Sequence, residues 1–395
     1  MLTDEQIEQI LYKYVKQQDE FNLSVIKIIA DRLSSMDDLD TLYSAKTTSI
    51  MRDDIEELQK LHKKYVKKQL GLLDEDFWWI AIVLYGEAEA YYLRQIALKE
   101  NKELINVIEK SLKTTKAQLA QALKLPVFVI RDLKTPTKLK PYSLEKTYRS
   151  VLTEAFSYRN VSKELRDIAL KRTETQLFDS GVRYALNNSS DDLQDVKNAN
   201  LAVRFNVLDG IKSFINKLQE IMGKQFGANA VELSAHIFPA PDHAPAQGHQ
   251  FTFENVEKMQ NGEDFEDVNG HVYFGFERNI GQWNCRHYFM QIKLGTKPQH
   301  SQKELDKILS DNDKGYTDEN GKHRTLYECT QVQRRYEREI RNAKDKYLYG
   351  KMLGDKNMMA NARNRVGKLT TAYKQFSNKC GIPAKLERIR VKDYQ

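Results

Sequence analysis

The sequence predicts a mainly α-helical α+β protein, and three features of the 395-residue chain support this class. Apolar residues recur at helical spacing from the start, and no proline precedes Pro126. Residues 224–300 are richer in glycine, histidine and aromatic residues, with shorter periodicity. The rest of the chain returns to helical spacing. We therefore expect a helical arm over 1–200, an α+β module over 201–300 and a basic helical hairpin over 301–395.

The helical arm is predicted from apolar stripes with helical spacing. These stripes consist of Ile7, Ile10, Leu11, Tyr14 and Val15, and of Ile55, Leu58, Leu61 and Tyr65. Asp4 and Asp54 are placed where acidic residues favour helix starts.

A proline-containing break interrupts this arm and is expected to form a loop or a short strand. It contains Pro126, Pro136 and Pro141. Helix is expected to resume from Leu144 to about Leu186, followed by a polar turn at 187–192. A further helix is predicted from Asn198 to Gly223.

Three segments of the module alternate as strands do, namely 231–238, 271–277 and 287–294. The sequence PAPDHAP, residues 239–245, is expected to be an extended, ordered loop.

Two apolar stripes near the carboxyl end predict a helical hairpin joined near Gly354. They consist of Val332, Tyr336, Ile340, Ala343 and Tyr347, and of Val366, Leu369, Tyr373 and Phe376.

The cysteines Cys285, Cys329 and Cys380 are few and widely spaced, which argues against a disulfide framework. No CxxC pair exists, so a four-cysteine zinc site within one chain is excluded.

The apolar run 77–86 is about half the length that spans a bilayer, and we interpret it as a buried core helix. The first residues lack a signal-peptide pattern, so we expect synthesis in a cytoplasm.

Positive charge is concentrated at the carboxyl end of the chain. Residues 330–395 carry 17 Lys and Arg against 6 Asp and Glu, whereas the whole chain has a net charge of +7. A basic segment on a nearly neutral body indicates a polyanion or an acidic protein surface as partner; a solvated helix face is the alternative.

Three segments carry a family resemblance: 227–251, which contains SAHIFPAPDHAPAQG, 280–295, which contains GQWNCRH, and 325–345, which contains TQVQRRYEREI. The order and the amino-acid sequences of these segments resemble those of the phage minor capsid protein 2 family. The stretches 202–211 and 381–391 resemble the lead-in and the closing segment of that family. HAPAQG and NCRH are also similar to the wider Mu F-type head-morphogenesis proteins.

The resemblance is specific from about residue 200 onward and implies a minor structural protein of a tailed phage head, not an enzyme. Such a protein is made in the infected bacterium and built into the virion near the portal. The implied partners are the portal or major capsid protein and packaged double-stranded DNA, bound without sequence specificity, with no membrane involved.

Relatives often carry an aromatic residue where this chain has Ala246. Some relatives have cysteines in this loop, but here none lies between 237 and 248, which rules out a cysteine-rich site in the loop.

Within these motifs, His236, His243, Cys285 and His287 form two pairs of potential zinc ligands. Cys285 and His287 lie two residues apart, so they point to one face of a strand. The alternative is that these side chains hydrogen-bond backbone groups and hold the proline-rich loop in place. We expect no cofactor unless these residues bind zinc.

A catalytic interpretation of the same segments is the runner-up function, as a transferase-like or nuclease-like module delivered with the genome. Asp242, His243, Gln247, Arg286 and His287 are the candidates for an acid–base cluster, and Cys285 with His287 for a nucleophile and its base. No nucleophile elbow, P-loop or HExxH sequence supports this, so we assign no catalytic residue.

The remaining motif residues are expected to shape the module. Gly248 and Gly281 are assigned to tight turns. Trp283 and Tyr288, which flank Asn284 and the rest of NCRH, are assigned to core packing.

The basic helix of the hairpin is the second candidate site, for packaged DNA or an acidic partner. Its candidate contacts are Arg334, Arg335, Arg338, Arg341 and Lys344, which we place on faces away from the apolar stripe. Glu337 and Glu339 intervene, and we expect part of the charge to be paired within the helix. A soluble helix surface is the alternative interpretation.

Overall fold

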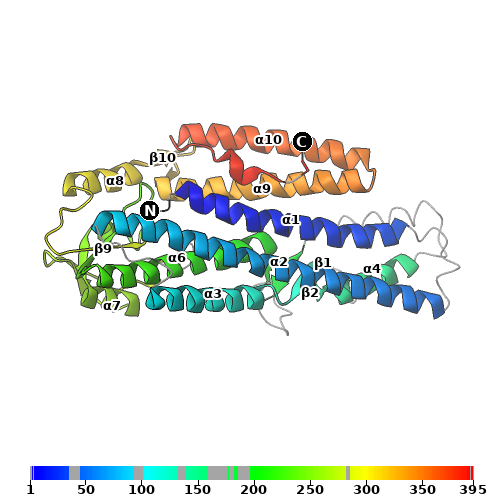
Figure 1. Ribbon diagram of the computed structural model, residues 1–395. Coiled ribbons are helices and arrows are strands. Elements are labelled where there is room, and N and C mark those ends of the chain that lie inside the picture. The colour runs from blue at the N-terminus through cyan, green and yellow to red at the C-terminus, as the bar shows by residue number, and fades with distance from the viewer. Residues whose placement is uncertain are drawn as a thin grey trace.

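The computed structural model describes residues 2, 4–34, 45–92, 101–131, 139–157, 177, 182–185, 196–281, 285–391 and 393–394. Over these residues the chain is mainly helical with small antiparallel sheets, which confirms the predicted class. The longest helices lie side by side along an elongated molecule (Figure 1).

The helices have the following bounds. They are α1 Asp4–Ser34, α2 Ala45–Tyr92, α3 Lys102–Ala122, α4 Leu144–Ser157, α6 Ala199–Gln225, α7 Phe253–Asn261, α8 Gln302–Lys314, α9 Leu326–Met352 and α10 Lys356–Lys379, with the 3-10 helices η5 Ala244–Ala246 and η6 Leu386–Ile389.

The strands form small sheets whose neighbouring strands are antiparallel. The first sheet has the order β2-β1-β3-β4, with bounds β1 Pro126–Arg131, β2 Leu139–Ser143, β3 Arg183–Ala185 and β4 Val196–Asn198. The second has the order β6-β5-β9, with bounds β5 Ala230–Leu233, β6 Gln250–Thr252 and β9 Phe289–Ile292. Two short pairs are β7 Phe265–Glu266 with β8 Val272–Tyr273, and β10 Tyr316–Thr317 with β11 His323–Arg324.

Helix α6 is the central helix of the largest core. Its start is capped by the side chain of Asn198, which accepts a hydrogen bond from the backbone of Asn200. Its apolar side chains pack in one cluster with those of α1, α2 and α3. Gly210 allows α6 and α3 to pack closely against each other, because a Cβ at this position would lie 2.3 Å from Cγ2 of Thr115 on α3. The limits of the three expected regions stay predictions, and α6, which we assigned to the module, shares its core with the arm helices.

Two parts of the arm differ from the prediction. Helix α4 begins at Leu144 as expected, and Leu177 is helical, but residues 183–185 form a strand between β1 and β4. Residues 158–176 and 178–181 of the expected helical segment lie outside the described residues. Backbone pairing with distant strands overrides the local helical pattern there. The polar turn expected at 187–192 lies outside the described residues.

Asp4 begins α1 as predicted, but Asp54 lies inside α2 and starts no helix. Its carboxylate accepts hydrogen bonds from Arg32 at 2.6 and 2.8 Å and from the hydroxyl of Tyr148. Asp54 therefore joins α2 to α1 and α4.

The strand predictions for the module are correct in position but too long. Within the three alternating segments, only 231–233, 272–273 and 289–292 pair as strands. The segment PAPDHAP is an ordered loop that leads into η5, as expected.

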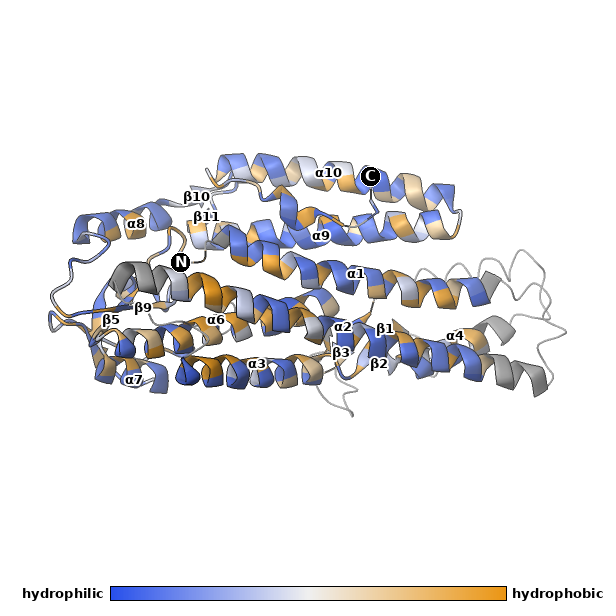
Figure 2. Cartoon of the chain, viewed as in Figure 1, coloured by the Kyte–Doolittle hydropathy of each residue, from blue (hydrophilic) through white to orange (hydrophobic). Residues whose placement is uncertain are grey.

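The carboxyl-terminal hairpin is confirmed. Helices α9 and α10 lie side by side along their length, on top of α1 in Figure 1, and Gly354 has the positive φ of 67° that their short connection requires. Their packed stripe includes Ile340, Ala343, Val366 and Tyr373. Most residues of both helices are hydrophilic, whereas the hydrophobic residues of α2 gather in its carboxyl-terminal half (Figure 2).

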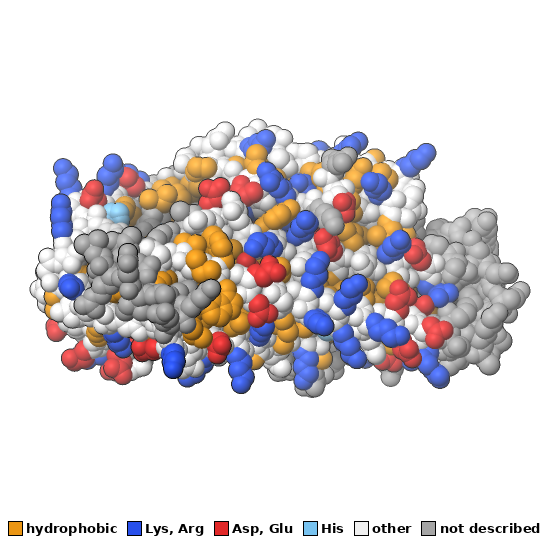
Figure 3. All heavy atoms as spheres, in the orientation of Figure 1, with side chains coloured by type: hydrophobic (Ala, Val, Ile, Leu, Met, Phe, Trp, Pro, Cys, Tyr) orange, Lys and Arg blue, Asp and Glu red, His pale blue; other side chains and the backbone are white. Residues whose placement is uncertain are grey.

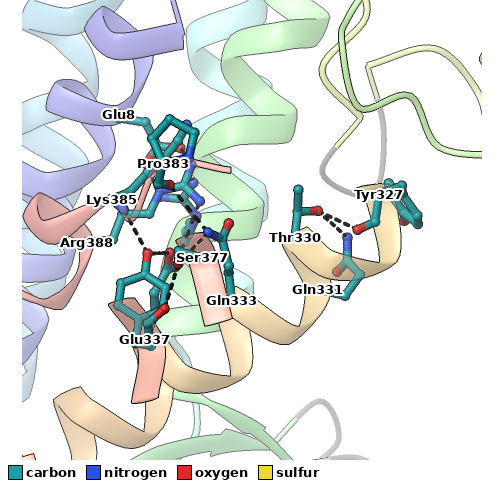
Figure 4. Close-up of polar contacts among 12 residues, drawn as sticks. Glu8, Tyr327, Thr330, Gln331, Gln333, Glu337, Ser377, Pro383, Lys385 and Arg388 are labelled. Carbon is teal, nitrogen blue, oxygen red and sulfur yellow. Dashed lines mark hydrogen bonds and ion pairs between the residues drawn. The ribbon is translucent and has the colours of Figure 1, made fainter. Parts of the chain in front are cut away.

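A polar network fixes the hairpin to the closing segment of the chain (Figure 4). The side chain of Gln333 donates to Ser377 Oγ at 2.8 Å. The Tyr373 hydroxyl donates to Glu337 at 2.9 Å and accepts from the backbone N–H of Lys385 at 2.8 Å. These contacts hold α9, α10 and the segment before η6 as one unit.

Candidate functional site

The motif residues meet at one end of the three-stranded sheet. Strand β5 pairs antiparallel with β9 so that Leu233 lies opposite Phe289. The residues that follow β5 therefore meet those that precede β9. The backbone N–H of Gly248 returns to the carbonyl of Leu233 at 2.7 Å, and this folds the proline-rich loop back onto the sheet.

Three of the four predicted ligand residues form a compact cluster. The sulfur of Cys285 lies 3.4 Å from Nδ1 of His243 and 3.6 Å from Nδ1 of His287. The ligand atoms of these three buried residues all lie within 4.8 Å of one another. His236 adjoins the cluster, with its ring centroid 4.6 Å from that of His287.

The outer nitrogen of each clustered ring is engaged by an acceptor. Nε2–H of His243 donates to the carbonyl of Arg278 at 2.9 Å, and the Arg278 guanidinium forms two hydrogen bonds to Asp242, at 2.6 and 2.7 Å. Nε2 of His287 lies 3.4 Å from Oε1 of Gln247, and the same oxygen accepts from the backbone N–H of His236 at 2.9 Å. The Arg278 carbonyl and Gln247 thus orient the two rings, and Asp242 holds the side chain of Arg278 in place.

Burial sets the protonation of the cluster. It lowers the pKa of His243 and, with the help of neighbouring His236, holds the pKa of His287 well below its ordinary value. Burial also raises the pKa of the Cys285 thiol, against the opposing effect of backbone N–H groups from Gly281 and His287. At neutral pH the rings are therefore neutral and the sulfur carries a proton.

The two glycines occupy turns, as predicted. Gly248 has a φ of 74°, and a Cβ there would lie 2.4 Å from Cδ2 of Leu305 on α8. Gly281 has a φ of 86°. The Arg286 carbonyl accepts a hydrogen bond from Lys212 at 3.0 Å, and the Arg286 side chain interacts electrostatically with Glu8 on α1. Trp283 and Asn284 lie outside the described residues.

The basic helix is less exposed than its sequence indicates. Two hydrogen bonds, at 2.6 and 2.8 Å, join Arg341 to Asp19 on α1, and the two side chains are only 11% and 3% exposed. Lys344 donates to the carbonyl of Ile389 at 2.7 Å. The side chain of Arg334 is half-buried, and burial together with nearby arginines lowers its pKa to about 10. Arg341 and Lys344 thus contact the rest of this chain, while Arg335 and Arg338 are exposed.

Glu337 and Glu339 of the basic helix form their closest polar contacts with α10, while Glu337 also interacts electrostatically with Arg334 within the helix, as expected. Glu337 accepts from Tyr373 on α10, and Glu339 pairs with Arg365 on α10 at 2.7 Å. The antiparallel neighbour α10 thus supplies a hydrogen-bond donor to each of the two glutamates.

Helix α10 carries a basic surface that the sequence analysis did not single out. It contains no Asp or Glu, and its basic residues are Lys356, Arg363, Arg365, Lys368, Lys374 and Lys379. All six are exposed, and Lys and Arg side chains project along the upper edge of the molecule in Figure 3. The absence of acidic residues between 356 and 379 was the signal that could have revealed it.

The apolar run 77–86 is only partly the buried helix we predicted. Phe77, Ile80 and Leu84 are buried on α2. Trp78 and Trp79, in contrast, are 37% and 41% exposed, and Ile82 on the same helix is 59% exposed. Hydrophobic side chains gather over α2 on the face shown in Figure 3.

Fold and site together define a mainly helical α+β protein whose histidine–cysteine cluster is closed off from solvent. The family model of phage minor capsid protein 2 matches residues 2–378. The chain therefore belongs to the phage minor capsid protein 2 family, whose members are structural proteins of the phage head. This confirms the resemblance and extends it over the arm, while the closing segment 381–391 lies beyond the match. No curated protein and no solved structure matches the chain.

The family places the protein in the virion, among other head components. Within the described part of the chain, no helix is long and apolar enough to cross a membrane. All three cysteines are free, in agreement with the absence of a disulfide framework.

Proposed function

We propose that this protein is a portal-proximal structural component of the phage head. In this proposal α2 contacts a neighbouring head protein and α10 faces packaged DNA. The observation that carries it is the family match over residues 2–378. The exposed surfaces of α2 and α10 are the contact surfaces in this proposal.

The exposed aromatic residues of α2 support a protein contact. Trp78, Trp79 and Ile82 form an apolar surface on a helix whose opposite face is packed in the core. Tryptophan is enriched at the centres of protein interfaces, because it buries a large area with little loss of conformational freedom. We assign this surface to the portal or the major capsid protein.

The charge of α10 supports proximity to DNA. A helix with six basic residues and no acidic residue attracts phosphates without reading bases. Arg335 and Arg338 on the neighbouring helix α9 are also exposed and add to this positive surface.

A structural role fits the cysteine–histidine cluster better than catalysis. A cysteine nucleophile has to reach its substrate as a thiolate. Cys285 is 3% exposed, and burial raises the pKa of its thiol. The contacts of the Arg278 carbonyl and Gln247 orient the rings and hold the loop.

The test is quantitative mass spectrometry of purified, nuclease-treated phage heads, before and after DNA ejection. We expect the wild-type protein at a few to a few tens of copies per head, a range set by its class as a minor component. The double variant W78A/W79A should fold but be depleted from heads. A matched control is Phe274→Ala, which removes an aromatic side chain that is 85% exposed on the module.

Absence of the wild-type protein from heads would contradict the structural role. Equal incorporation of both variants would contradict the assignment of α2 as the contact surface. Loss of the protein from heads on ejection would point to the runner-up, a module delivered with the genome.

A further inference from the structure

We propose that Cys285, His243 and His287 bind a zinc ion through the cysteine sulfur and the Nδ1 atoms of the two histidines, with His236 as the neighbour that completes the site. The site would lie between the proline-rich loop and the start of β9. It is separate from the surfaces of α2 and α10 and independent of their roles.

The sulfur–nitrogen distances of the cluster fit a tetrahedral zinc site. With Zn–S near 2.3 Å and Zn–N near 2.05 Å, a tetrahedral angle places sulfur and nitrogen about 3.6 Å apart. The two separations from the Cys285 sulfur are 3.4 and 3.6 Å. The same geometry requires the two histidine nitrogens to lie about 3.3 Å apart, and since all ligand atoms lie within 4.8 Å of one another, the rings would have to approach by at most about 1.5 Å.

The hydrogen bonds around the cluster fix which nitrogens carry protons. The carbonyl of Arg278 can only accept, so Nε2 of His243 is the donor and Nδ1 presents a lone pair. Oε1 of Gln247 already accepts from the backbone of His236, so Nε2 of His287 donates to it and its Nδ1 also presents a lone pair. Zinc-binding histidines are oriented in this way, by an acceptor on the outer nitrogen.

The cluster has more acceptors than protons. Two buried Nδ1 lone pairs face one sulfur, and a thiol has a single proton to donate. One lone pair therefore meets no proton from this thiol, which is costly in a buried site. A zinc ion resolves this by replacing the thiol proton and accepting both lone pairs.

The surroundings of the sulfur offer donors and positive charge that would stabilise a zinc-bound thiolate. The sulfur of Cys285 interacts with the backbone N–H groups of Gly281 and His287 and with the positive charges of Arg278 and Lys212. The negative charge of Asp242 offsets that of Arg278. Nitrogen and sulfur ligands select zinc over magnesium and calcium, which prefer oxygen.

His236 is a further ligand-type side chain beside the cluster. It lies three residues after the end of β5, with its ring centroid 4.6 Å from that of His287. It is not one of the three residues whose ligand atoms lie within 4.8 Å of one another, so its ring would have to turn toward the ion to take the fourth position. A fourth protein ligand would close the site, as in structural zinc sites. Zinc would then link β5, the proline-rich loop and β9, and stabilise the module.

The experiment uses the full-length protein, with zinc measured by elemental mass spectrometry. We expect about one zinc per chain in the wild type and a loss to below about a tenth in C285S, H243A and H287A. The matched control is Cys380→Ser, which alters another buried cysteine and should keep full zinc. H236A should retain zinc with an affinity lowered by about 10- to 100-fold.

Cobalt substitution keeps the proposal testable if a variant fails to fold. Wild-type protein stripped of metal by a chelator should bind Co²⁺ with a thiolate-to-metal charge-transfer band and a tetrahedral visible spectrum, and zinc should displace the cobalt. It should also melt at a higher temperature when zinc is restored. A stripped wild-type protein that binds neither metal, or that binds both equally well after C285S, would overturn the site. Unchanged affinity in H236A would overturn the role of His236.

Discussion

At the scale of single residues, Arg341 joins the hairpin to the arm. Its guanidinium forms two hydrogen bonds to Asp19 in a nearly solvent-free contact. Removing one member of a buried pair leaves the other charge without compensation, which costs about 3 kcal/mol. Arg341→Ala should therefore lower the free energy of unfolding by about this amount, measured by urea denaturation followed by circular dichroism.

The exposed residue Arg338, one helical turn earlier, provides the control for this variant. Arg338→Ala should change the free energy of unfolding by less than about 0.5 kcal/mol. Equal effects of the two substitutions would show that the contact with Asp19 contributes little.

Glu8 makes the fold sensitive to acid. Burial raises its pKa, but ion pairs with Arg204 and Arg388 outweigh burial and lower the pKa from 4.5 to about 2. A lowered folded-state pKa stabilises the protein above the unfolded value, and this stability is lost as the pH falls from about 4.5 through about 2. The contribution is of the order of 3 kcal/mol.

Glu8→Gln should therefore destabilise the protein at neutral pH, and the difference from wild type should shrink as the pH falls through this window. Thermal unfolding of both proteins across that pH range measures it. A difference that stays constant with pH would rule out titration of Glu8 as its cause.

At the scale of elements, what could be predicted from the sequence depends on the range of the contacts involved. The hairpin was predictable because residues such as Tyr336 and Ile340 repeat at helical spacing along one segment. The inward direction of Arg341 was not, because Asp19 lies 322 residues away. Strand β3 was missed for the same reason, since its partners are the distant strand β1 and the later strand β4.

The candidate cluster was predictable as a set of residue types but not as a geometry. The sequence analysis named His236, His243, Cys285 and His287 as candidate ligands, while the pairing of β5 with β9 brings the last three together. The orienting role of the Arg278 carbonyl carried no signal, because a backbone acceptor can belong to any residue.

The packing of α6 against α3 gives a prediction about an element contact. In Gly210→Ala the new methyl group would meet Thr115, and overpacking costs about 1–3 kcal/mol. The gain in helix propensity offsets up to about 1 kcal/mol of this. We expect a net loss of stability of about 1 kcal/mol, and its recovery in the double variant T115A/G210A, in urea denaturation.

Gly367 on α10 is the matched control, because a Cβ there meets nothing within 4 Å. Gly367→Ala should stabilise the protein by about 0.5–1 kcal/mol through helix propensity alone. Stabilisation of similar size at Gly210 would mean that α3 and α6 are not closely packed at this point.

At the scale of the whole molecule, the two exposed surfaces lie on different parts of the fold. The apolar surface lies on α2, which is packed in the main core, while the basic surface lies on α10, on the far side of the hairpin from α1 (Figure 1). A protein with this arrangement can contact a neighbouring head protein and DNA at the same time, without competition between them.

The DNA-facing role proposed for α10 predicts that DNA binding depends on salt concentration. Each phosphate contact contributes about −0.9 to the slope of log affinity against log salt concentration. If Lys368 and Lys374 each contact a phosphate, K368E/K374E should reduce the magnitude of this slope by about two and weaken binding to duplexes of unrelated sequence equally. Fluorescence anisotropy with labelled DNA over a series of salt concentrations measures both quantities. The control K110E/K113E reverses two exposed lysines on α3, so it changes the net charge by the same amount. If both variants lose affinity and slope equally, the effect comes from net charge, and α10 is not the DNA-facing surface.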